Sequence, residues 1–239
     1  MTTKRLLLIS NSTHSGCGYL DHCAAEMQDF LGAAGRILFV PFAIHDRAAY
    51  ADMARARLAR MGYDLTSLHD AEDSKEAVRL ARAIFIGGGN TFRLLDALYE
   101  LDLLGAIRHR VEEGVPYVGT SAGSNVACVT IKTTNDMPIV QPPSFDALGL
   151  VPFNINPHYL DPNPGSTHQG ETREERIREF HEVNDPVVVG LREGAMLRIE
   201  GSHAVLKGSA GARVFARGRS PVDYAPEASL DFLLSPGSA

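Results

Sequence analysis

The fold of this chain is decided by the stretch Pro116-Tyr117-Val118-Gly119-Thr120-Ser121-Ala122-Gly123-Ser124-Asn125. An apolar run ends in the pattern G-x-S-x-G and passes directly into small residues that a helix accepts, which is typical of a nucleophile elbow. A serine at such a bend adopts strained backbone angles, and glycines two residues to either side prevent collisions between Cβ atoms. The pattern predicts that Ser121 lies at the carboxyl edge of a sheet, with the N–H of Ala122 free to stabilise an oxyanion. The alternative is that it marks only a tight strand-to-helix turn.

The composition indicates one globular domain with a small partner. The chain has 239 residues, of which 44% are hydrophobic, and this supports one sizeable core without requiring a second. We expect a single α/β domain over residues 1–234 and a frayed tail over residues 235–239. The formal net charge is −6 and no block of Lys or Arg occurs, which argues against nucleic acid or a membrane surface as partner.

Apolar runs and cysteines together indicate a cytoplasmic protein. The first apolar run covers only Leu6 to Ile9, and none is long enough for a signal-peptide core or a bilayer span. The three cysteines, Cys17, Cys23 and Cys128, cannot all pair and lack C-x-x-C spacing, so we expect free thiols and no bound metal. Cys128 lies among apolar residues, and we interpret it as a buried thiol rather than a nucleophile.

Strands and helices alternate along the first half of the chain. Continuous apolar runs predict buried strands, and the segments between them have helical spacing. The predicted strands are 5–10, 36–42, 63–68 and 83–86, and the predicted helices are 19–31, 47–60, 75–82 and one or two within 91–113. This alternation predicts a parallel sheet covered by helices on both faces, with right-handed crossovers.

The second half of the chain contains long loops and short strands instead of alternating strands and helices. Residues 133–138 and 156–170 are rich in loop formers, and long ordered loops in a compact domain are usually functional. A charged surface helix is predicted over residues 171–182. Short strands with turns between them follow at 186–191, 195–200, 204–207 and 212–216. We expect these strands to form an antiparallel extension of the sheet.

Three loops are expected to meet in one crevice. Ligands of an open α/β sheet bind beyond the carboxyl ends of its strands, where residues 10–15, the run Gly87-Gly88-Gly89-Asn90 and the elbow should converge. The glycine run could cradle a phosphate, lend N–H groups to an oxyanion, or form only a tight turn. It fits neither G-x-G-x-x-G nor a P-loop, because Phe92 occupies the last glycine position and no Gly-Lys-Ser/Thr follows.

A serine nucleophile needs a histidine to accept its proton and an acid to hold that histidine's tautomer. Of the nine histidines, His158 is the strongest candidate, because it ends the short apolar stretch Ile155-Asn156-Pro157 at the mouth of the long loop. The other eight have contexts more typical of a surface.

Six motifs follow one another between about Leu6 and Gly208: Leu8 to Ser12, Ile86 to Phe92, Gly119 to Gly123, Thr133 to Val140, Ile155 to His158 and Gly170 to Glu174. In their order and spacing they together resemble the peptidase E family of α-aspartyl dipeptidases. The resemblance implies a fold similar to that of class I glutamine amidotransferases, with a flavodoxin-like, mostly parallel sheet. It also implies a serine dipeptidase that hydrolyses Asp-Xaa dipeptides through an acyl-enzyme, without a cofactor.

The resemblance also assigns the catalytic residues. Carried over position by position, it makes Ser121 the nucleophile, His158 the base and Asp136 the acid of a charge-relay triad. Glu193 is the alternative acid, because it follows the predicted strand 187–191 and so lies on the same edge of the sheet.

Further contacts are expected around the triad. An apolar pocket cannot stabilise the carboxylate of a substrate aspartate, because the carboxylate would lose its hydration without gaining a partner. A cationic side chain is therefore needed. We expect Arg173 to bind this carboxylate when the loop Asp161 to Gly170 closes. The other predicted contacts are the oxyanion donors Gly88, Gly89 and Ala122, and the supporting substrate donors Asn90 and Thr91.

Two other functions are alternatives to the dipeptidase. A cyanophycinase-like hydrolase of β-aspartyl bonds would use the same scaffold, but so short a chain lacks an extra element to form a groove for a polymer. A flavodoxin-like nucleotide-binding module would hold a phosphate on Gly87-Gly88-Gly89 and would not react with serine-directed reagents. The sequence is compatible with either a monomer or a homodimer.

Overall fold

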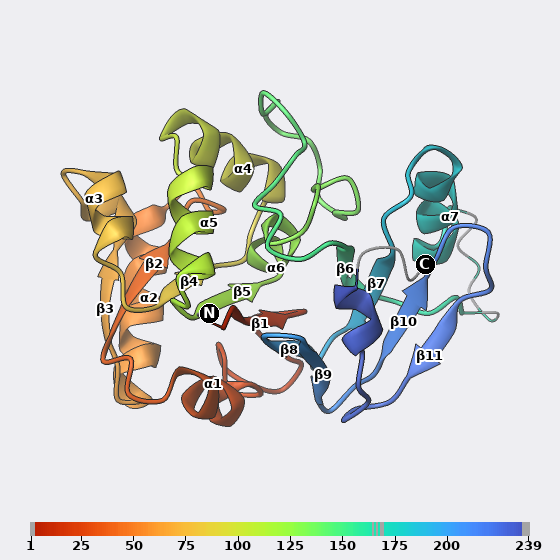
Figure 1. Ribbon diagram of the computed structural model, residues 1–239, viewed down its shortest axis with the longest axis horizontal. Helices are drawn as coiled ribbons and strands as arrows, with labels where there is room; N and C mark the ends of the chain where they lie inside the picture. Colours follow the sequence, from red (N-terminus) through yellow and green to blue (C-terminus); the bar gives the residue numbers. More distant parts are fainter. Residues whose placement is uncertain (1–2, 164, 166, 168–169, 236–239) are drawn as a thin grey trace.

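The computed structural model describes residues 3–163, 165, 167 and 170–235. Its core is a seven-stranded sheet with helices on both faces, and a four-stranded sheet lies beside it (Figure 1). The predicted α/β fold with a mostly parallel central sheet is confirmed. Most of the predicted tail, from residue 236 onward, lies outside the described residues.

The large sheet brings two strand ends together at its centre. Its order is β3 (Asp64–Ser67), β2 (Arg36–Val40), β4 (Ile84–Ile86), β5 (Tyr117–Thr120), β1 (Arg5–Ile9), β8 (Ala195–Glu200) and β9 (His203–Gly208). The first five strands are parallel, and β8 and β9 extend the sheet antiparallel. Because Ile9 is in register with Thr120, the next residues along each strand, Ser10 and Ser121, lie side by side.

Helices cover both faces because successive side chains of each buried strand point to opposite sides. Leu7 and Ile9 pack in the apolar cluster beneath α1 and α2, whereas Leu6 and Leu8 belong to the cluster beneath the other four helices. The helices are α1 (Ala24–Leu31), α2 (Arg47–Arg60), α3 (Ser74–Arg79), α4 (Thr91–Glu100), α5 (Leu104–Glu112) and α6 (Ala122–Val126). None of the helices described here is long and apolar enough to cross a membrane.

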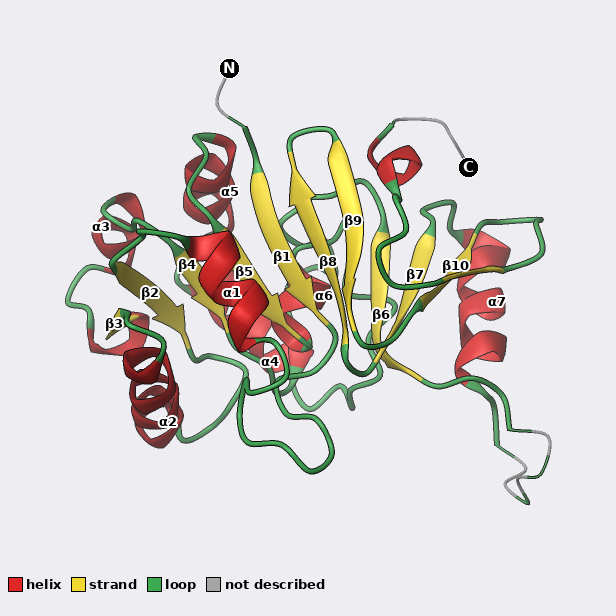
Figure 2. Ribbon diagram, turned by 90° about the horizontal axis from the view of Figure 1, so that it is seen from below, coloured by secondary structure: helices red, strands yellow, loops and turns green. Residues whose placement is uncertain are grey.

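The smaller sheet supports one further helix. Its order is β11 (Val222–Tyr224), β10 (Ala212–Phe215), β7 (Val188–Arg192) and β6 (Asn154–Tyr159), and Figure 2 shows its strands beside those of the large sheet. The helix α7 (Arg173–Val183) packs Ile177 and Phe180 against this sheet. It starts with a capping box, in which Thr172 and Glu175 satisfy each other's backbone N–H groups.

The second sheet was not predicted. We expected all the C-terminal strands to extend the first sheet, but β7 and β10 join β6 instead, and β6 runs parallel to β7. Part of β6 was predicted as loop because it contains Asn156 and Pro157. Since β6 is an edge strand, Pro157 removes no donor that the sheet requires, and the Asn156 amide donates to the Thr133 carbonyl at 2.8 Å.

The start of the first helix also differs from the prediction. The first helix begins at Ala24 rather than at residue 19, because Leu20 has a φ of 57° and interrupts the helical path. The segment 91–113, predicted as one or two helices, forms two, and Asp102, with a φ of 50°, lies between them.

Candidate active site

Ser121 occupies a sharp bend between β5 and α6. Its φ of 51° and ψ of −107° are unusual for a residue other than glycine. A Cβ added to Gly119 would lie 2.5 Å from the Gly123 carbonyl oxygen, and one added to Gly123 would lie 2.1 Å from the Ile86 carbonyl oxygen. Close approach of the backbone therefore requires glycine at both positions, as the elbow pattern predicts.

The histidine that faces Ser121 comes from the second sheet. His158 Nε2 lies 2.9 Å from Ser121 Oγ. His158 has a φ of 53° and lies at an irregularity in β6, where the register with β7 shifts between Pro157 and Tyr159. Such a bulge re-aims a side chain, and here it accompanies a histidine that faces the elbow. Both residues of this pair thus have backbone angles of the strained kind that is common at functional sites.

The carboxylate that contacts His158 belongs to Glu193. Its Oε1 lies 2.7 Å from His158 Nδ1, and Glu193 directly follows β7. A carboxylate at Nδ1 holds the proton there, so that Nε2 is left to accept a proton from the serine. Ser121, His158 and Glu193 therefore have the relative positions of a nucleophile, a base and an orienting acid.

Asp136 lies at the start of α4, and among the described residues its carboxylate bonds to threonines and not to His158, which corrects its predicted contact with the histidine. Its Oδ2 accepts hydrogen bonds from the N–H of Thr91 at 2.8 Å, from the Thr91 hydroxyl at 2.6 Å and from the Thr134 hydroxyl at 3.1 Å. A carboxylate is stabilised at the N-terminus of a helix by free N–H groups and by the helix dipole. Asp136 thus fastens its own loop to the start of α4.

Two buried polar residues, Ser10 and Asn11, form hydrogen bonds with the backbone around His158 and Glu193. The sequence pattern had assigned them no role. Ser10 Oγ donates to the Leu191 carbonyl at 2.7 Å and accepts from the His158 N–H at 2.9 Å. Asn11 Oδ1 accepts from the Gly194 N–H at 2.8 Å. These bonds connect the end of β1 to Leu191 and Gly194, which lie on either side of Glu193 in the chain. Their position directly after a central buried strand is the feature that could have identified them.

The glycine loop after β4 lies beside the elbow, as the expected convergence of strand ends predicts. A Cβ added to Gly88 would lie 3.2 Å from Ser121 Cβ. Gly89 has a φ of 134°, and its added Cβ would lie 2.6 Å from the Ala43 carbonyl oxygen. Close packing therefore requires glycine at Gly88 and Gly89. Because glycine has no side chain, the backbone of Gly88 lies directly beside Ser121. Ala122 is the first residue of α6, where an N–H has no acceptor within the helix.

Asn90 and Thr91, which were predicted to bind substrate, have partners within the protein. Asn90 caps α4 by accepting from the Arg93 N–H at 3.0 Å, and its amide donates to the Met137 carbonyl at 2.8 Å. The Thr91 hydroxyl donates to Asp136. Both side chains hold the loop that carries Asp136 against α4.

Arg173 is a half-buried cation at the first position of α7. Within the described part of the chain it has no carboxylate in ion-pair contact. The pKa of its guanidinium is lowered, first because burial disfavours the charge and then because Arg176 is near, whereas Asp136 acts in the opposite direction. The helix dipole also disfavours a cation at this end of a helix. Burial, Arg176 and the helix dipole thus all disfavour the charge of Arg173, and Asp136 favours it.

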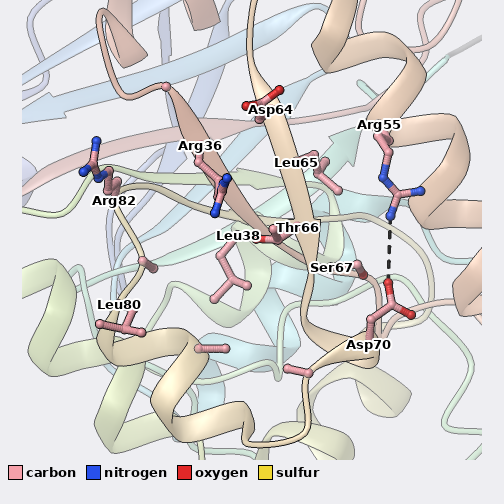
Figure 3. A pocket seen from close by; sticks show the side chains of 14 residues that line it. Arg36, Leu38, Arg55, Asp64, Leu65, Thr66, Ser67, Asp70, Leu80 and Arg82 are labelled. Carbon is pink, nitrogen blue, oxygen red and sulfur yellow. Dashed lines mark ion pairs between the residues drawn. The ribbon is translucent and has the colours of Figure 1, made fainter.

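A second serine contacts a histidine at the outer edge of the large sheet. Ser67 Oγ lies 2.6 Å from His69 Nδ1, and His69 Nε2 lies 3.1 Å from Asp70 Oδ1. A cavity of about 780 Å³ adjoins this edge, where Arg55 pairs with Asp70 (Figure 3). Ser67 has ordinary extended backbone angles and is only 5% exposed, so it is not presented to a substrate as Ser121 is.

The fold and the site together define an α/β protein with a serine at a nucleophile elbow and a histidine–glutamate pair behind it. Residues 6–207 match peptidase family S51, and the chain belongs to this family. The predicted resemblance to peptidase E is confirmed by relatives across the whole length.

The relatives are similar over nearly the whole chain. The chain is 54% identical over 229 residues to "Peptidase E" of Streptomyces coelicolor, across 96% of this chain and 94% of that one. It is 49% identical over 236 residues to the "Probable alpha-aspartyl dipeptidase" of Drosophila melanogaster, across 98% of both. The crystal structure of a peptidase from an acI-B1 actinobacterium has a TM-score of 0.72 with 19% identity across 96% of both chains, which supports the fold.

Proposed function

We propose that this protein is a serine dipeptidase that hydrolyses Asp-Xaa dipeptides with a free N-terminal aspartate. The observation that carries the proposal is the pair of contacts at the elbow, 2.9 Å from Ser121 Oγ to His158 Nε2 and 2.7 Å from His158 Nδ1 to Glu193 Oε1. Membership of peptidase family S51 supports a peptide substrate, and the names of the relatives support aspartate as its first residue.

The proposed reaction proceeds through an ester on Ser121. Its Oγ attacks the carbonyl carbon of the aspartyl residue while His158 Nε2 accepts the hydroxyl proton, and Glu193 stabilises the imidazolium that forms. His158 then gives the proton to the leaving amine, so the peptide bond breaks and the aspartyl ester remains. A water molecule, deprotonated by His158, attacks the ester and releases aspartate and the free serine.

The oxyanion of each tetrahedral intermediate needs donors that are already in place. We assign this role to the N–H groups of Ala122 and of Gly88 or Gly89. The start of α6 leaves the Ala122 N–H without a helical acceptor, and Gly88 packs directly against Ser121. One such donor contributes about 10²- to 10³-fold in kcat.

Selection of aspartate is assigned to Arg173. A half-buried guanidinium with no ion-pair partner among the described residues gains a charge-assisted, bidentate partner when a substrate carboxylate binds. Asp136 acts on Arg173 through its charge, and Asn90 and Thr91 hold the Asp136 loop in place. These three residues therefore support the specificity site indirectly.

Turnover of Asp-Leu and Leu-Leu tests the activity. We expect the protein to cleave Asp-Leu in strong preference, and Ser121→Ala to reduce that turnover by roughly 10⁴-fold or more, because the triad acts as a unit. Ser67→Ala is the matched control, since Ser67 also contacts a histidine but lies away from the elbow. Appreciable activity in Ser121→Ala, or loss of activity in Ser67→Ala alone, would contradict the assignment of the nucleophile.

Arg173→Met tests the specificity site. We expect kcat/KM for Asp-Leu to fall by about 30- to 1,000-fold, the equivalent of about 2 to 4 kcal/mol for a lost charge-assisted contact, with a much smaller loss for an uncharged ester. Arg176→Met is the control, because Arg176 lies one turn further along α7 and faces Glu171. Equal losses on both substrates would place the specificity determinant elsewhere.

We also propose a cytoplasmic location. The three cysteines are free thiols, with Cys17 exposed and Cys23 and Cys128 buried. Free thiols persist in a reducing compartment, which supports this location.

A further inference from the structure

A series of ion pairs leads from Arg192 to the start of α7. Arg192 holds both oxygens of Asp161, at 2.7 Å from Nε and 2.6 Å from Nη2. The same Nη2 lies 2.6 Å from Asp223 Oδ1. Arg213 Nη1 lies 2.9 Å from Asp223 Oδ2, and Arg213 Nε lies 3.3 Å from Glu174 Oε2. We refer to these five residues as the Arg192 series.

The series joins elements that are far apart in the chain. Arg192 is the last residue of β7 and directly precedes Glu193, whereas Glu174 lies in the first turn of α7 and directly follows Arg173. Asp161 comes shortly after β6, the strand that carries the active-site histidine. Figure 1 shows β7, β10, β11 and α7 as neighbours. The two ends of the series therefore lie next to the proposed catalytic acid and next to the proposed specificity residue.

The guanidinium of Arg192 is held in a defined position. It pairs with Asp161 in the bidentate manner that gives arginine–carboxylate contacts their fixed geometry. It also lies over the Tyr159 ring, 5.7 Å from the centroid, and its side chain is 23% exposed. The hydrogen bonds to Asp161 raise the pKa of Arg192, and in return the pKa of Asp161 is lowered. Both partners thus stay charged across the working pH range.

The other end of the series is buried. The Glu174 side chain is only 8% exposed, and its carboxylate contacts Arg213 and Arg178. A buried carboxylate is strongly disfavoured without such partners, so its position is constrained by them. Because Arg213 is a residue of β10, this contact, an ion pair without hydrogen-bond geometry at Arg213 Nε, links the first turn of α7 to the second sheet.

We propose that Arg192 is a positioning residue for the reaction. Through Asp223, Arg213 and Glu174 it fixes the first turn of α7, and so sets the place of the Arg173 guanidinium relative to the triad. The pair with Asp161 anchors Arg192 itself at the end of β7. This inference rests on the proposed function, because its effect is exerted through the carboxylate-binding role of Arg173.

A double-mutant cycle tests the proposal. We expect Arg192→Met to lower kcat/KM for Asp-Leu by about 10- to 100-fold, chiefly through KM, and to leave hydrolysis of an uncharged ester within about twofold. The variant Arg173→Met combined with Arg192→Met should be no worse on Asp-Leu than Arg173→Met alone, because a positioning effect requires the positioned group. Arg192→Lys should show an intermediate loss, since it keeps the charge but not the fork.

Arg217→Met is the matched control. Arg217 pairs with Asp185 at 2.7 Å and donates to the Glu182 carbonyl, so it contacts the far end of α7 and no member of the Arg192 series. We expect it to leave both substrates unaffected. Should Arg192→Met fail to fold, Asp223→Asn interrupts the series at its middle, and the same difference between the two substrates is expected.

Several outcomes would overturn the proposal. They are unchanged kinetics in Arg192→Met, equal losses on both substrates, or losses that multiply in the double mutant. A wild-type protein that leaves Asp-Leu intact, and whose Ser121 is not labelled by a fluorophosphonate, would contradict the proposed function and this inference together. Wild-type turnover with an unaffected Arg192→Met contradicts this inference alone.

Discussion

At the residue scale, Glu193 and Asp136 differ in the atoms that their carboxylates contact. Glu193 lies 2.7 Å from the imidazole of His158. Asp136 accepts hydrogen bonds from Thr91 and Thr134, and among the described residues it bonds to no histidine. The first arrangement suits a group that orients a base, whereas the second suits a group that orders a loop.

Glu193→Gln and Asp136→Asn therefore have different expected effects. Glu193→Gln should lower kcat by about 10²- to 10⁴-fold with little change in KM, because the imidazolium loses its counter-charge and the tautomer is no longer held. Asp136→Asn should cost about 1 kcal/mol of stability through the weakened contact with α4, with a smaller effect on kcat. Steady-state kinetics and urea unfolding of both variants measure this. A severe loss of kcat in Asp136→Asn with a mild one in Glu193→Gln would return the acid role to Asp136.

At the element scale, the elbow depends on how tightly α6 packs against its neighbours. A helix of five residues is too short to be stable alone. It is held by Ser124, whose hydroxyl donates its one proton to the Ile9 carbonyl at 2.8 Å or the Gly119 carbonyl at 2.9 Å, and by the contact of Gly123 with the end of β4. The strained angles of Ser121 persist because these contacts leave the chain no other path.

Gly123→Ala tests this packing. Because the added methyl group would lie 2.1 Å from the Ile86 carbonyl oxygen, backbone must move, and we expect a loss of about 1 to 3 kcal/mol in the free energy of unfolding together with a fall in kcat. The control is Gly105→Ala in α5, where an added Cβ meets nothing within 4 Å and the better helix former should raise stability by about 0.5 to 1 kcal/mol. Urea unfolding curves measure both; equal stabilities for Gly123→Ala and wild type would show that the elbow can relax.

At the scale of the whole molecule, the site is assembled from both sheets. The large sheet supplies Ser121, and the small sheet supplies His158 and Glu193. Ser10 and Asn11, at the end of β1, accept hydrogen bonds from the backbone N–H groups of His158 and Gly194 and so hold the two sheets together at this point. Any change that separates the sheets should therefore remove activity before it unfolds either one.

Burial across the molecule also predicts the reactivity of the thiols. Cys17 is exposed, whereas burial raises the pKa of Cys23 and of Cys128 to about 12 in each case. At pH 8 we expect a disulfide reagent to modify Cys17 alone in the native protein and all three thiols in denaturant, because the thiolate is the reacting form. Cys17→Ser should abolish the native reaction. Rapid modification of a second thiol in the native state would contradict the predicted burial.

Local pattern was sufficient for much of this protein. The alternation of apolar runs and helices specified the parallel sheet, and G-x-S-x-G specified the elbow, because both depend on residues that are close in the chain. The convergence of the glycine loop on Ser121 followed from the geometry of parallel strands, whose carboxyl ends share one edge. His158 followed from its place beside a long loop and from the family resemblance.

The tertiary structure decided the features that depend on contacts between residues far apart in the chain. Asp136 and Glu193 are both acidic residues in turns near the same edge, and only the placement of β7 beside β6 brings Glu193 to the imidazole. The sequence did not predict the second sheet, because the alternating pattern of a short strand does not specify which sheet the strand joins. The Arg192 series likewise joins charges that appear in the sequence as ordinary surface residues. The sequence thus determined which groups could react, and the tertiary structure decided which of them meet, because hydrogen bonds act over about 3 Å.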